Sequence, residues 1–118
     1  MSPSRLKSQR QSTLCCAPQE GEAALTLKEI TKLAGQLKAI ADPVRLQIIT
    51  HLLDQVDQES CTCILAPIVK LSEPTVSHHL KKLETAGFLT KERRGMSVYY
   101  QVVPESIHAI AQALHIYC

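Results

Sequence analysis

The chain has 118 residues, of which 45% are hydrophobic and only 3% aromatic, and its formal net charge is +2. This length fits one domain that buries roughly two-thirds of its unfolded surface, with a core of aliphatic side chains. No apolar run approaches the roughly 20 residues that span a bilayer, and the basic, polar start lacks the apolar stretch of a signal peptide. We therefore expect a cytoplasmic protein without a membrane partner, in which any basic surface for nucleic acid is local.

Residues 1–23 are rich in Ser, Gln and Arg and show no periodicity, which predicts a flexible tail that carries Cys15 and Cys16. Residues 24–118 are the predicted folded domain. The number of cysteines, five, is odd, and thiols stay reduced in the cytoplasm. Metal or redox chemistry is therefore favoured over structural disulfides.

Two helices are predicted at the start of the folded part. The capping box formed by Thr26 and Glu29 begins the first, and apolar residues recur along it at helical spacing as far as Ile40. Asp42 followed by Pro43 begins the second, because Asp accepts hydrogen bonds from the first free N–H groups and Pro has no N–H to satisfy.

Two further helices are predicted after the polar connector DQVDQES. The third is short and is expected to begin near Ala66, because Pro67 fits a first helical turn. The fourth begins at Ser72 and runs to about Ala86, where Gly87 ends it. Its apolar stripe consists of Val76, His79, Leu80 and Leu83. On this stripe His79 is expected to be a packed core residue.

The segment FLTKERRGMSVYYQVV predicts a β-hairpin, with Arg93 and Arg94 near its tip and Gly95 in the turn. A last helix is predicted to open around Pro104. The expected fold class is mainly α with a small β-hairpin, with five helices in all.

The third and fourth helices, joined by KLSEP, match a helix-turn-helix, and the hairpin makes it winged. A helix that presents Thr, Ser, His and Lys can enter the major groove, and arginines on a projecting turn can reach the adjacent minor groove or backbone. An isolated cluster of lysines and arginines is usually only a charged surface in contact with water. Here the helix-turn-helix, the hairpin and the basic residues occur in the order that a DNA-binding protein has, and this order favours DNA binding. The candidate DNA-binding residues are Ser72, Thr75, Ser77, His78, Lys81, Lys82, Arg93 and Arg94.

LKAIADPVRLQII and LSEPTVSHHLKKLETAGFLTKERRGMSVYYQV together resemble the ArsR/SmtB family of metal-responsive repressors, over about residues 24–115. The resemblance implies a homodimeric winged helix-turn-helix repressor, dimerised by its first and last helices. Such a protein binds a palindromic operator and dissociates when it binds a metal or metalloid. Glu73 stands where family members usually have Gln, so this position either reads a cytosine amine or faces away from DNA.

The resemblance also implies where the inducer binds. One class of members uses a Cys-x-Cys element at the third helix, which falls on Cys61 and Cys63, often with thiols from the tail, here Cys15 and Cys16. Cysteines two apart diverge on a regular helix but share one side of an extended segment, so they converge if Pro67 delays the helix. A helix N-terminus would also favour the thiolate form.

Another class of members uses a zinc site on the last helix. The ligand pair that begins this site falls on Pro104 and Ser106, so the zinc site is expected to be absent. At the thiol site, Ile64 replaces a common Asp, which leaves a sulfur-only donor set.

Sulfur-only sites favour thiophilic ions. We expect As(III) or Sb(III) as inducer of a repressor that controls an arsenic-resistance operon, with no organic cofactor. Cd(II), Pb(II) or Zn(II) sensing and a thiol–disulfide switch remain alternatives. Cysteines buried as small hydrophobic residues are the simplest alternative. An enzyme is not expected, because Cys-x-x-Cys, a His/Glu metal triad and a Gly-rich phosphate loop are all absent from the sequence.

Overall fold

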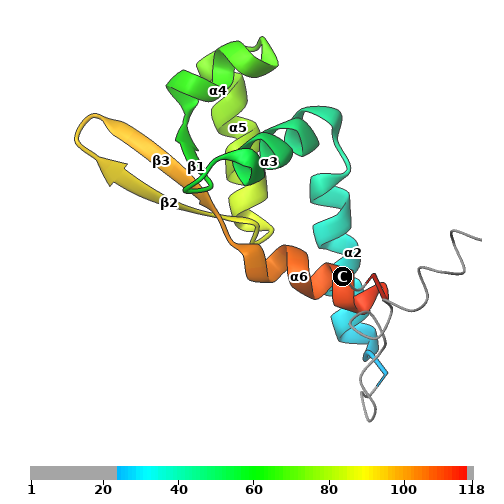
Figure 1. The fold of residues 1–118 in the computed structure, drawn as a ribbon. Helices are drawn as coiled ribbons and strands as arrows, with labels where there is room; N and C mark the ends of the chain where they lie inside the picture. The colour runs from blue at the N-terminus through cyan, green and yellow to red at the C-terminus, as the bar shows by residue number, and fades with distance from the viewer. Residues whose placement is uncertain (1–23, 117–118) are drawn as a thin grey trace, which may run out of the picture.

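The structure is a computed structural model that describes residues 24–116. This part of the chain forms five α-helices and a three-stranded antiparallel sheet (Figure 1). The helices are α2 (Leu27–Ile40), α3 (Pro43–Asp54), α4 (Thr62–Val69), α5 (Glu73–Thr85) and α6 (Pro104–Ala113), and the strands are β1 (Glu59–Cys61), β2 (Leu89–Arg94) and β3 (Ser97–Val102). The predicted fold class is thereby confirmed. The predicted tail lies outside the described residues.

The first two helices begin where their capping residues predict. The Thr26 hydroxyl accepts a hydrogen bond from the Glu29 N–H at 3.1 Å, and the Glu29 carboxylate accepts one from the Thr26 N–H at 2.8 Å. The Asp42 carboxylate accepts from the Val44 N–H at 2.9 Å, with Pro43 in the first turn of α3. These local contacts satisfy N–H groups that no helical carbonyl can reach.

The predicted start of the third helix near Ala66 is wrong, because α4 already begins at Thr62 and Pro67 lies inside it. Pro67 has no N–H to donate to the carbonyl of Cys63, so one helical hydrogen bond is missing. Leu65 is fully buried and Ala66 is 6% exposed, and their burial offsets this absence.

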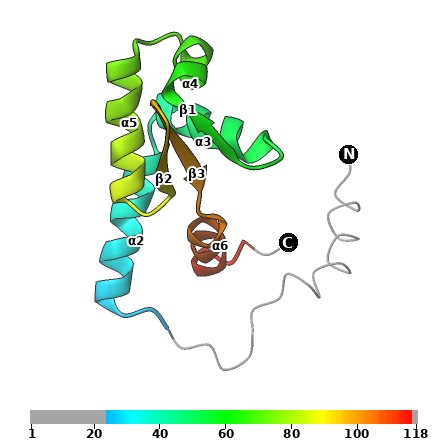
Figure 2. The same ribbon diagram turned by 90° about the vertical axis from the view of Figure 1, so that its left-hand side faces the viewer.

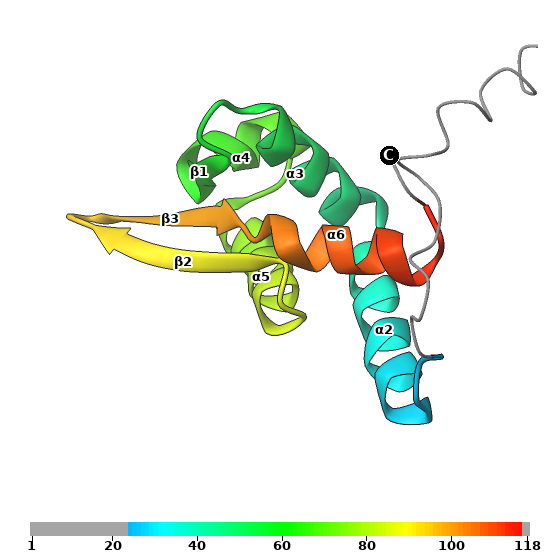
Figure 3. The same cartoon turned by 60° about the horizontal axis from the view of Figure 1, so that its bottom comes forward.

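Strand β1 was not predicted, because it is only three residues long and its first two residues belong to the polar connector DQVDQES. It pairs with β3 so that Cys61 lies opposite Tyr99 and Glu59 lies opposite Gln101. The strand order is β1-β3-β2, and the β2–β3 hairpin extends well beyond β1 (Figure 3). Gly95 begins the hairpin turn with φ +64°, a left-handed conformation that favours glycine.

The hydrophobic core lies between α3, α4, α5 and the base of the sheet. Its fully buried residues include Ile48, Leu52, Leu65, Val76, Leu80, Leu83 and Phe88. By contrast, α2 and α6 contain no buried residue, and they lie at the end of the molecule away from the hairpin tip (Figures 1 and 3). None of the described helices is long and apolar enough to cross a bilayer.

Candidate DNA-binding face and thiol site

Helix α5 is held in the molecule by one side only. Val76, Leu80 and Leu83 are fully buried, whereas His78, Lys81 and other residues of the opposite side are exposed. Because side chains three and four apart share a face of a helix, this burial leaves a continuous polar side open to solvent. The predicted division of the helix into core and solvent sides is confirmed.

The helix begins at Ser72, whose hydroxyl accepts from the Thr75 N–H at 3.4 Å and lies 2.9 Å from the Thr75 hydroxyl. Of the candidate DNA-binding residues on this element, Ser77 is half-buried; the exposed ones are Ser72, Thr75, His78, Lys81 and Lys82. The structure thus brings hydroxyl, imidazole and ammonium groups to one surface, the donor set that contacts base edges and phosphates.

His79 is half-buried beside the core, close to the start of α3. Its Nδ1 is buried without a hydrogen-bond partner, as is Nε of Arg45. Backbone N–H donation from Arg45 lowers the pKa of the Asp42 carboxyl, and His79, which lies nearby, contributes to the lowering in a smaller degree. His79 therefore belongs to the packing between α3 and α5 and not to the exposed polar side.

The two candidate arginines of the hairpin differ in their surroundings. Arg94 donates to both carboxylate oxygens of Glu59, at 2.6 and 2.9 Å, and to Glu92 at 2.9 Å. Its guanidinium also lies 4.6 Å from the centroid of the Tyr99 ring. Arg93 is exposed, and its Nη1 is 3.5 Å from the Gly95 carbonyl oxygen. Arg93 is therefore the better placed of the two to reach DNA.

These hydrogen bonds shift the pKa values of Glu59 and Arg94. The Arg94 guanidinium, by donating hydrogen bonds, holds the pKa of the Glu59 carboxyl below its usual value. The same bond raises the pKa of Arg94 further above its usual value, with Glu92 contributing. Glu59 was not singled out in the sequence, because its role depends on β1 pairing beside the hairpin.

Cys61 and Cys63 lie where β1 ends and α4 begins. Cys61 is 2% exposed and is the N-cap of α4, with extended backbone angles of −114° and 167°. Cys63 follows in the first turn of the helix and is exposed. The predicted convergence is confirmed, but its cause is the change from strand to helix between the two residues, and not a delay imposed by Pro67.

The two sulfurs are joined as a disulfide, with the Cα atoms 5.4 Å apart. The sequence had favoured reduced thiols here, so the structure differs from that expectation. The strand–helix junction places the two side chains within bonding reach, which makes this disulfide possible between residues only two positions apart. Ile64, which replaces a possible oxygen ligand, is half exposed beside them.

The described residues supply no complete metal site: within residues 24–116, no three His, Cys, Asp or Glu side chains are grouped to hold an ion. Cys15 and Cys16, predicted as the other ligands, lie outside the described residues. The thiol site, defined as Cys61 and Cys63, therefore consists in this structure of two sulfur atoms joined to each other.

The thiol site is connected to both DNA-facing elements. Thr62, between the two cysteines, donates a hydrogen bond to the Glu73 carboxylate at 3.4 Å, in the first turn of α5. On the other side, Glu59 begins the strand that ends at Cys61 and is bound to Arg94 of the hairpin. Glu73, the departure from the usual Gln, thus contacts Thr62, the residue between the two cysteines.

An exposed polar helix in a helix-turn-helix, beside a projecting hairpin, defines a winged helix-turn-helix DNA-binding protein. Residues 42–91 match the model of the family described as "Bacterial regulatory protein, arsR family". The chain belongs to this ArsR family of transcriptional regulators, which are not enzymes.

The chain is similar to several named relatives. It is 32% identical over 81 residues to the arsenical resistance operon repressor of Bacillus subtilis, covering 69% of this chain and 75% of that one. It is 37% identical over 79 residues to an arsenic resistance transcriptional regulator of Pseudomonas putida, covering 67% of this chain and 60% of that one. It is 31% identical over 80 residues to a cadmium resistance regulatory protein homologue of Staphylococcus aureus, covering 68% and 64%.

The fold agrees with solved structures. A crystal structure described as a possible transcriptional regulator for arsenical resistance aligns with a TM-score of 0.60 at 30% identity, covering 68% of this chain and 79% of that one. The predicted family resemblance and winged helix-turn-helix fold are therefore confirmed.

Proposed function

We propose that this protein is an operator-binding repressor that As(III) or Sb(III), bound to cysteine thiolates, releases from the DNA of an arsenic-resistance operon. The observation that carries the proposal is the position of the thiol site: Cys61 and Cys63 converge at a junction that contacts α5 through Thr62. A ligand that binds Cys61, Cys63 and a thiol of the tail at the same time would displace this junction, and α5 would move with it.

The proposal includes a homodimer on a palindromic operator. Helices α2 and α6 leave apolar side chains open to water, with Leu27 78%, Ile30 46% and Leu114 46% exposed. Burying them against a second copy would recover roughly 25 cal/mol for each Å² of apolar surface. A twofold dimer presents two α5 helices, which matches the symmetry of a palindromic site.

The donor chemistry favours a thiophilic metalloid. As(III) and Sb(III) need three sulfurs, and Cys61 and Cys63 would supply two, with the third from the tail pair Cys15 and Cys16. Both thiols must be reduced before they bind, because the thiolate is the metal ligand. The relatives named for arsenic resistance support this inducer, and the relative named for cadmium resistance supports the alternative of Cd(II), Pb(II) or Zn(II) bound by four thiolates.

The proposed mechanism is a population shift between two dimer conformations. The inducer has a higher affinity for the dimer conformation that does not bind DNA than for the conformation that does. The ratio of these two inducer affinities sets how far the inducer can lower operator affinity. A hundredfold decrease in operator affinity requires about 2.7 kcal/mol of coupling. The Thr62–Glu73 hydrogen bond carries a displacement of the thiol site to α5, and the Glu59–Arg94 ion pair carries it to the hairpin.

The test is operator release under reducing conditions, followed by fluorescence anisotropy on a duplex that the protein selects from randomised DNA. Arsenite should release the wild type but not the Cys61→Ser, Cys63→Ser or double Cys15→Ser/Cys16→Ser variants, all of which should still bind DNA. Titration with Cd(II) separates the two inducer classes. Arsenite release that survives the removal of both Cys61 and Cys63 would refute the assignment.

The disulfide between Cys61 and Cys63 favours a second candidate, a redox-sensing repressor. In this reading, oxidation of the two thiols to the disulfide by a peroxide, which is itself reduced to water or an alcohol, changes the strand–helix junction and operator affinity. Release by peroxide in a metal-free buffer, reversed by dithiothreitol and abolished in Cys63→Ser, would establish it. Peroxide without effect on anisotropy would exclude it.

A further inference from the structure

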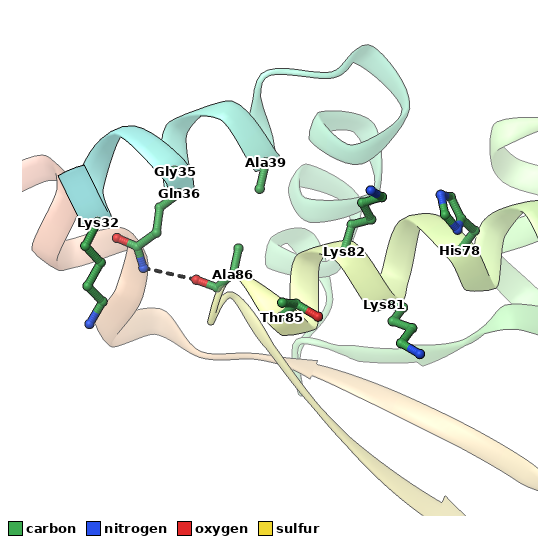
Figure 4. A pocket seen from close by; sticks show the side chains of 9 residues that line it. All are labelled: Lys32, Gly35, Gln36, Ala39, His78, Lys81, Lys82, Thr85 and Ala86. Carbon is green, nitrogen blue, oxygen red and sulfur yellow. Dashed lines mark hydrogen bonds between the residues drawn. The ribbon is translucent and has the colours of Figure 1, made fainter.

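A groove with a volume of about 680 Å³ lies between α2 and α5 (Figure 4). Four basic side chains line it, namely Lys32 of α2 and His78, Lys81 and Lys82 of α5. Among the described residues that line the groove, none carries a carboxylate. Three ammonium groups without an acidic side chain among these lining residues create a positive potential, which attracts an anionic ligand.

A hydrogen bond joins the two walls of the groove. The Gln36 side-chain amide donates to the Ala86 carbonyl at 3.1 Å, which ties α2 to the C-terminal end of α5 (Figure 4). Small residues, Gly35 and Ala39, leave the space open on the α2 side. Both walls are helices joined by this bond, and Ala39 and Ile40 of α2 also pack against the core, so the basic side chains of the two helices project from walls that lie side by side.

The groove lies beside the proposed DNA-binding face. His78, Lys81 and Lys82 belong both to the groove and to the exposed polar side of α5. Helices α5 and α2 follow one another along the same edge of the molecule (Figure 2). Lys32 lies on α2 beyond Ala86, the C-cap of α5, so it extends the basic lining of the groove past the end of that helix (Figure 4). This edge extends from the helix-turn-helix towards the part of the chain that would form the dimer.

We propose that the groove between α2 and α5 binds phosphates of the operator backbone, and that Lys32 is a DNA contact outside both the helix-turn-helix and the hairpin. The inference rests on the proposed DNA-binding function and adds a contact to it. An ammonium group contacts phosphate without reading the base, so Lys32 contributes affinity and salt dependence but no sequence preference.

The first test compares Lys32→Gln with Lys38→Gln, which removes the same charge from α2 at an exposed residue outside the groove. DNA affinity is measured against salt concentration with the operator duplex and with a mixed-sequence duplex. DNA affinity decreases as salt concentration rises. On both duplexes, Lys32→Gln should make the plot of log affinity against log salt less steep by about 0.9 for each phosphate that the variant no longer neutralises. Lys38→Gln should match the wild type.

The second test uses Gly35, where an added Cβ meets no atom within 4 Å. Glu and Gln both have higher helix propensity than Gly, so Gly35→Glu and Gly35→Gln should both fold. Only Gly35→Glu places a negative charge in the groove, and it should weaken binding to both duplexes by roughly tenfold relative to Gly35→Gln at about 0.1 M salt. A slope for Lys32→Gln equal to that of Lys38→Gln, or equal affinities for the Gly35 pair, would overturn the inference while the proposed function stands. A wild type that binds neither duplex would overturn both.

Discussion

The Thr62–Glu73 hydrogen bond is a direct link from the thiol site to α5, and we predict that it transmits part of the inducer response. Thr62→Val removes the hydroxyl but keeps the shape of the side chain, and Thr62→Ser keeps the hydroxyl. Both variants should bind operator and arsenite, because neither the cysteines nor the exposed side of α5 is altered. The ratio of operator affinities without and with arsenite should fall in Thr62→Val and be retained in Thr62→Ser.

The geometry limits the size of this effect. The oxygens are 3.4 Å apart and both residues are at least partly exposed, which places the bond at the weak end of its class. A net contribution of about 0.5–1 kcal/mol corresponds to a two- to fivefold decrease in coupling. A hundredfold response would therefore drop to about 20- to 50-fold, which anisotropy titrations with a labelled duplex resolve. Equal ratios for Thr62→Val and Thr62→Ser would refute this route.

Three further outcomes follow from the fold. Because Arg94 lowers the pKa of Glu59, the carboxylate stabilises the folded state fully above its ordinary pKa of 4.5, and this contribution disappears as the pH falls below it. The melting temperature of Glu59→Gln should therefore be lower than that of the wild type at neutral pH, and the difference should shrink on acidification; a constant difference would contradict the ion pair. Arg93→Ala should reduce the salt slope of DNA binding by about 0.9 for each phosphate left without its cation, whereas Arg94→Ala should mainly lower the melting temperature, and the reverse pattern would show that their roles are exchanged. Leu80→Ala, at a fully buried position of α5, should cost about 2.7–5 kcal/mol in urea unfolding, and a cost well under about 1 kcal/mol would show that α5 does not pack as described.

Features that depend on neighbours in the sequence could be predicted without the structure. The capping box at Thr26 and the Asp42–Pro43 start act through residues at most three positions away, and they define where α2 and α3 begin. The alternation of buried and exposed residues along α5 follows from helical periodicity. The position of the hairpin turn follows from the left-handed conformation that Gly95 adopts.

Other features could not be predicted, because they depend on residues far apart in the chain. Pro67 is accommodated inside α4 because Leu65 and Ala66 are buried in a core built by other helices. Strand β1 exists because β3, about forty residues later, offers it a free edge. The pairing of Glu59 with Arg94 follows from that edge and separates the roles of two adjacent arginines that look alike in the sequence.

The sequence by itself therefore determined the helices other than the start of α4, the hairpin and the family, because short-range capping, periodicity and motif spacing carry that information. Only the tertiary structure decided how Cys61 and Cys63 meet, that Glu73 accepts a hydrogen bond from Thr62 between them, and which lysine of α2 lies in one groove with the basic side chains of α5. These depend on packing between segments distant along the chain, where a single strand–helix junction or helix contact sets the distances between functional groups.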